Sequence, residues 1–131
     1  MKVFTTPAIV EDSSWVLLAY IGTTAAAAAV QSSFSSIALD VYDKENSANA
    51  VVSGSSLTIA AVISNTLLYD RGWTTKFATS DALGYNFSYV TPASYLPTGG
   101  RVFRFQVGFD FGGGVKTYGI WDVPTLDLMG R

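Results

Sequence analysis

The chain has 131 residues, about the length of one domain, with 10 acidic and 8 basic side chains, no cysteine and no histidine. These absences exclude a histidine-assisted serine nucleophile, a thiolate nucleophile, a Cys/His zinc site and a disulfide bond. Charged residues make up 14% of the chain, against about 25% in an ordinary soluble domain, so we expect a subunit of a homo-oligomer. We expect no nucleic acid as partner, because the sequence contains no basic stripe.

The N-terminal region, residues 1–33, contains an apolar run over 15–21. This run is too short to cross a membrane, and it follows Glu11 and Asp12 where a signal peptide would carry basic residues. We therefore expect neither a membrane anchor nor a signal peptide.

The segment 23–36 consists mainly of threonine, alanine, glutamine and serine. This composition is compatible with an extended arm that becomes ordered against another subunit, or with an ordinary first strand or helix of the domain. Residues of the N-terminal region that could contact another subunit are Trp15, Tyr20, Ala27 and Val30.

The segment 34–42 alternates between apolar and polar residues, with Ile37, Leu39 and Val41 on one face. This period of two predicts a half-buried strand. A polar turn over 43–47, a short strand over 50–52 and a second turn over 53–56 then predict a hairpin.

The next apolar stretch, 57–63, fits a strand or a short helix capped at Ser56. We favour the strand because β-branched residues dominate it. Residues 65–76 are interpreted as a connection in which Trp73 anchors the core.

A short motif follows, in which Asp81 precedes Tyr85 by four residues and Phe87 by six. The spacing is that of the tyrosine corner at the start of strand F in immunoglobulin-like sandwiches, with Phe87 in place of the usual cysteine. We interpret it as structural, with a strand over 85–90.

The clearest strand pair is C-terminal. Residues 102–111 alternate strictly between a face of Phe and Val side chains and a polar face, a glycine turn follows at 112–114, and 115–121 returns as the partner strand. Pro124 is expected to end the pairing and leave a tail over 124–131. The predicted fold is an all-β, immunoglobulin-like antiparallel sandwich over 34–123, with the N-terminal region as an extended arm or extra strand.

Candidate chemical sites are few. A catalytic pair would need Asp40 together with Glu45 or Asp110, but we interpret the carboxylates around this turn as solvated. We therefore expect no catalytic residue, cofactor or metal ion, and we assign no role to the glycosylation motif at Asn86. An aromatic platform for sugars could use Trp73, Tyr95 or Trp121.

Five segments of the chain, 36–43, 57–63, Trp73, 84–87 and 101–107, together resemble small immunoglobulin-like structural proteins of tailed bacteriophages. The resemblance covers about residues 34–121. It implies a non-enzymatic virion protein, made in the host cytoplasm, that contacts the major capsid protein or tail proteins. It transfers no functional residues, because the matching positions are strand and corner residues.

The expected function is therefore a capsid decoration or cement protein that stabilises the shell through protein contacts. Two alternatives stay open. One is a structural subunit of the neck, tail or baseplate, and the other is a carbohydrate-binding module of a host-recognition appendage.

Overall fold

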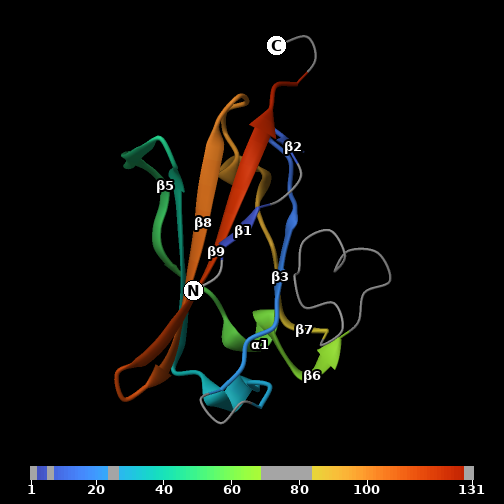
Figure 1. Cartoon of the computed structure of the whole chain (residues 1–131), viewed down its shortest axis with the longest axis vertical. Helices are drawn as coiled ribbons and strands as arrows, with labels where there is room; N and C mark the ends of the chain where they lie inside the picture. Colours follow the sequence, from blue (N-terminus) through green and yellow to red (C-terminus); the bar gives the residue numbers. More distant parts are fainter. Residues whose placement is uncertain (1–2, 6–7, 24–26, 69–83, 129–131) are drawn as a thin grey trace.

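The computed structural model describes residues 3–5, 8–23, 27–68 and 84–128. Its strands form two sheets that pack face to face as an all-β sandwich (Figure 1). The larger sheet has the order β1-β9-β8-β4-β5, with β2 also paired to β9, and the smaller sheet has the order β3-β7-β6. The prediction of an all-β sandwich is confirmed.

The strands of the larger sheet are β1 (Val3–Thr5), β2 (Ile9–Val10), β4 (Ser36–Asp43), β5 (Asn46–Ser56), β8 (Val102–Gly112) and β9 (Val115–Leu126). Those of the smaller sheet are β3 (Val16–Ala19), β6 (Ile63–Leu68) and β7 (Tyr85–Val90). The described helices are single turns, namely η1 (Gln31–Ser33), α1 (Ile59–Val62) and η3 (Ala93–Tyr95).

Strands β4 and β8 carry the alternation that the sequence predicts, and β9 is the predicted partner strand of β8. In β4 and β8, the residues with apolar side chains on the predicted inner face are buried, apart from half-buried Phe111 at the end of β8. The turn between β8 and β9 contains Gly112, Gly113 and Gly114, all with positive φ, a conformation that glycine adopts at little cost.

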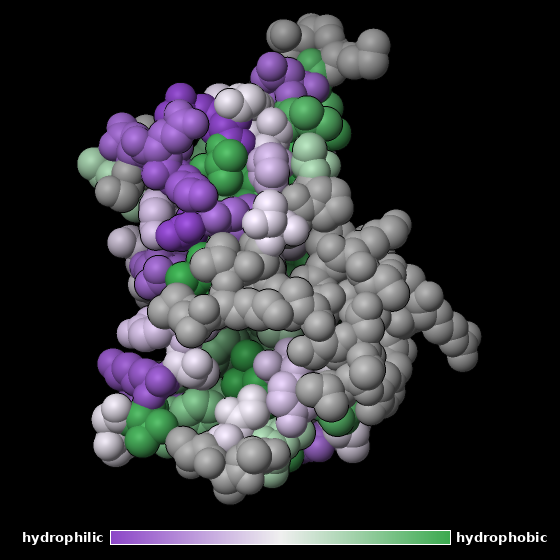
Figure 2. All heavy atoms as spheres, in the orientation of Figure 1, coloured by the Kyte–Doolittle hydropathy of each residue, from purple (hydrophilic) through white to green (hydrophobic). Residues whose placement is uncertain are grey.

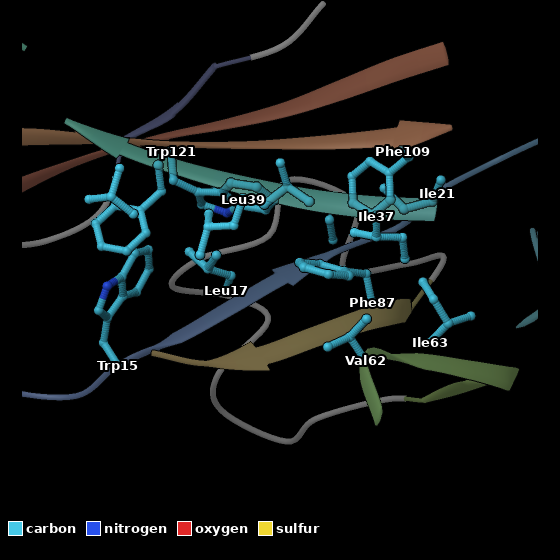
Figure 3. Close-up of a cluster of buried hydrophobic side chains, with 14 of the residues drawn as sticks. Trp15, Leu17, Ile21, Ile37, Leu39, Val62, Ile63, Phe87, Phe109 and Trp121 are labelled. Atoms are coloured by element: carbon cyan, nitrogen blue, oxygen red, sulfur yellow. The ribbon is translucent and has the colours of Figure 1, made fainter. Parts of the chain in front are cut away.

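The core lies between the two sheets (Figure 3). Phe87 of the smaller sheet meets Phe109 edge to face at a ring-centroid distance of 5.1 Å, and its ring lies 6.0 Å from that of Trp121. Trp15 likewise meets Phe105 edge to face at 5.5 Å. These rings join the two layers.

Of the two alternatives for residues 1–33, an extended arm or an extra strand of the domain, the described part forms strands of the sandwich. Strand β3 pairs antiparallel with β7, β1 pairs parallel with β9, and Leu17 is fully buried. Trp15 is only 4% exposed, so its ring belongs to the core and is not available to another subunit. The apolar run over 15–21 contains β3.

Asn86 of β7 ties the end of this region to the smaller sheet. Its side chain is buried; the oxygen accepts the N–H of Ile21, and the amide nitrogen donates to the carbonyl oxygens of Ile21 and Ala29. A short antiparallel bridge between Gly22 and Ala28 closes the loop between them. The boundary expected at 33/34 therefore does not separate two units.

Pro124 does not end the last strand, which continues to Leu126. The N–H of Thr125 donates to Arg101 next to β8, so the preceding nitrogen, that of Pro124, points to the opposite side. There it falls between the parallel pairs Thr5–Asp122 and Ile9–Thr125. On that side no described strand residue is paired with Pro124, while Val102 pairs with it on the other side, so the described ladder loses little by the missing N–H. The expected C-terminal tail thus begins inside the sandwich.

The segment 57–63 is not the strand that we expected. The larger sheet ends at Ser56, the one-turn helix α1 follows, and β6 begins at Ile63 in the other sheet. The chain must cross between layers here, and the helical turn makes this crossing while burying Val62. The strand β6 takes up residues 65–68 of the expected connection, and β5 continues through the expected turn at 53–56 with an irregular register against β4.

Leu17→Ala tests whether the N-terminal region is part of the cooperative fold. We expect the free energy of unfolding to fall by ~2–5 kcal/mol, the usual cost of removing a buried leucine side chain. Urea unfolding followed by circular dichroism measures it. If this region were a loose arm, the change would stay within about 0.5 kcal/mol.

Candidate functional site

Two of the residues singled out for a tyrosine corner are described. Phe87 is fully buried, and Tyr85 begins β7, the middle strand of the smaller sheet, which spans the predicted residues 85–90. A tyrosine corner would join Tyr85 to the chain upstream of it, where residues 69–83 lie outside the described part, so the corner stays a prediction. Asp81 and Trp73 lie outside the described residues.

The remaining residues expected at an interface differ in exposure. Ala27 is exposed, whereas Tyr20 and Val30 are half-buried. Of the expected sugar platform, Trp121 is fully buried in the core and Tyr95 is half-buried in η3. Trp121 therefore cannot stack on a ligand in this fold, because its ring fills the space beneath Phe87.

The carboxylates considered as a catalytic pair lie on the outer face of the larger sheet. Asp40 accepts the N–H of Gly54 at 2.7 Å, and Asp110 accepts that of Gly112 at 2.8 Å. Asp110 is paired with Ser36, four residues before Asp40 on β4, so the two backbones are about 13 Å apart along the strand. Paired catalytic carboxyl groups lie about 5–10 Å apart. Among the described residues, no cluster of three acidic side chains could hold a metal ion.

An ion-pair network lies at one end of this outer face, where Figure 2 shows hydrophilic residues gathered near the β4–β5 hairpin. Asp122 is buried and accepts two hydrogen bonds from Arg104, at 2.8 and 3.0 Å, and one from Lys44 at 3.0 Å. Tyr42, Arg104 and Asp122 form one cross-strand row of β4, β8 and β9. The hydrogen bonds from Arg104, with help from Lys44, hold the pKa of Asp122 below its usual value of 3.8. The sequence pattern gave no indication that these strand residues would pair.

A second ion pair joins the hairpin to the loop before β8. Arg101 donates to Asp43 at 2.5 Å, and the other carboxylate oxygen of Asp43 accepts the N–H of Glu45. The charges at this end of the sheet therefore hold the β4–β5 hairpin in place.

A wide opening lies on one side of the sandwich, between the end of β5, helix α1 and the end of β7. We call it the flank, a hollow of about 460 Å³ lined by Ser55, Ser56, Leu57, Thr58, Ala61, Val62, Ser88, Tyr89 and Val90. It combines hydroxyl groups with an apolar floor. Val90 is 64% exposed, more than any other large apolar residue that the structure describes.

The backbone of β7 is also open at the flank. Thr91 donates its N–H to Trp15, on the β3 side, so the N–H and C=O of Val90 point the other way. On that side β6 pairs with β7 no further along than Phe87, which lies opposite Ile63, the first residue of β6. The residues before Ile63 form the helix α1 and not a strand. Within the described chain, β7 therefore has strand partners on both sides at Phe87 but not at Val90.

Comparison of the chain with protein-family models, with curated proteins and with solved structures found no match. In the described part of the chain, no helix is long and apolar enough to span a membrane.

Asp122→Asn tests the ion-pair network through its pH dependence. The folded-state pKa of Asp122 is lowered, so its charge stabilises the fold above the unfolded pKa of about 3.9 and ceases to do so as the pH falls through the folded value. We expect the variant to be less stable by roughly 1–3 kcal/mol at pH 7. Urea unfolding between pH 7 and pH 2 should show this difference shrinking in acid. A difference independent of pH would contradict the assignment.

Proposed function

We propose that this chain is a non-enzymatic structural protein of a tailed-phage virion, a capsid decoration or cement protein that acts through protein contacts. The resemblance of residues 34–121 to immunoglobulin-like phage proteins supports this function. The flank would be the surface through which the protein contacts another protein. The flank is the single observation that carries the proposal, because it joins an apolar floor to an open strand edge.

The strand order supports the immunoglobulin-like part of the proposal. In such sandwiches, strands C, F and G share one sheet, and strands B, E and D share the other. Taken in chain order, β4, β8 and β9 occupy the places of C, F and G, while β3, β6 and β7 occupy those of B, D and E. The parallel pairing of β1 with β9 adds a first strand to the larger sheet.

The composition of the flank supports a protein partner. Its lining contains no charged side chain among the described residues, so burying it against another protein requires no desolvation of an ion. An exposed strand edge beside an apolar surface is a usual site for association. The occupant that we propose is a second copy of this chain, as the low charged fraction predicts.

Val90→Lys tests the flank as the contact between copies. A lysine at an open strand edge discourages pairing with another chain, while the exposure of Val90 leaves the fold little affected. We expect sedimentation analysis of the unmodified protein, at concentrations above the micromolar range, to show a closed oligomer. The variant should sediment as a monomer.

Leu126→Lys is the matched control, because Leu126 is 51% exposed and lies at the end of β9, away from the flank. It should leave the oligomer intact. A monomeric unmodified protein, or equal loss of association in both variants, would count against the flank as the self-contact.

A further inference from the structure

A shallow hollow on the outer face of the larger sheet is separate from the flank and from the ion-pair network. It has a volume of about 190 Å³ and is centred on the cross-strand row Ala38, Gly108 and Tyr118. Asp40 lies at one side of the row, and Asp110 lies at the other with Lys116 opposite it. The hollow is therefore an apolar centre between polar sides.

The ring of Tyr118 lies against the sheet at this place. A Cβ atom at position 108 would stand 3.1 Å from Cε1 of Tyr118, which is closer than such atoms ordinarily approach. Any residue other than glycine here would therefore have to displace the ring. Tyr118 is nevertheless 40% exposed. The Cδ1–Cε1 edge of the ring thus lies over Gly108, while the side chain stays accessible to solvent.

The two carboxylates beside the ring are fixed by the backbone. One oxygen of Asp40 accepts the N–H of Gly54, and one oxygen of Asp110 accepts the N–H of Gly112. Their second oxygens make no hydrogen bond within the described part of the chain. Each can accept a hydroxyl group from a ligand without giving up its backbone partner.

We propose that this hollow binds one neutral hexose ring of a glycan. An aromatic face packs against the C–H groups on one side of a sugar ring, and flanking carboxylates accept its hydroxyl groups. The volume is below the ~300 Å³ at which ordinary small-molecule pockets begin, which fits a single ring. Two carboxylates and one ammonium group leave the hollow negative, so an acidic sugar binds less well than a neutral one.

The test is a titration of the ¹⁵N-labelled protein, followed by amide chemical shifts. The probes are the methyl glycosides of glucose, galactose and mannose, with glucuronic acid as the acidic comparison. We expect saturable shifts at Gly108, Asp110 and Tyr118 with at least one methyl glycoside, in the millimolar range typical of a single small ligand, and weaker binding of glucuronic acid.

Two variants keep the test independent of folding. Tyr118→Ala removes the ring and should lower affinity about tenfold, equal to about 1.4 kcal/mol, but it also uncovers Gly108. Ala38→Val therefore serves as the second variant, because it keeps the ring, suits a strand and fills the centre of the hollow. It should abolish binding.

Val115→Ala is the matched control, since Val115 is 41% exposed on the same hairpin and does not line the hollow. It should bind as the unmodified protein does. The proposal is overturned if none of the three glycosides shifts these amides, or if binding persists in both Tyr118→Ala and Ala38→Val.

Discussion

The fold depends on covering the apolar inner face of the larger sheet with a smaller one. Strands β4, β8 and β9 supply a broad inner face, and the described strands that cover it are β3, β7 and β6. Phe87 stands at the centre of this contact, between Phe109 and Trp121. Every strand of the smaller sheet is therefore needed, including the one that the N-terminal region provides.

The crossing between the sheets accompanies the opening at the flank. After β5 the chain passes through α1 into the smaller sheet, and within the described chain β7 has no strand partner on that side at Val90. The ion pairs of the described chain lie elsewhere, around Asp122 and Asp43. The protein thus separates the ions that stabilise its larger sheet from an uncharged surface suited to another protein.

The sequence predicted the strands whose alternation is strict, such as β8, and the burial of Phe87. It failed where tertiary position overrides local pattern. The nitrogen of Pro124 lies between two paired segments of the described chain, and the segment 57–63 connects the two sheets. Neither fact can be inferred from the local sequence pattern. The candidate surfaces were beyond prediction for the same reason, because Tyr118 meets Gly108 only through the register of β8 and β9.

Amide hydrogen exchange at low and high protein concentration would show whether the protein works through contacts at the flank. We expect added protection at high concentration, confined to the end of β5, α1 and residues 88–90, while the amides of β8 exchange equally slowly in both samples. Added protection elsewhere, or exchange that does not depend on concentration, would contradict it.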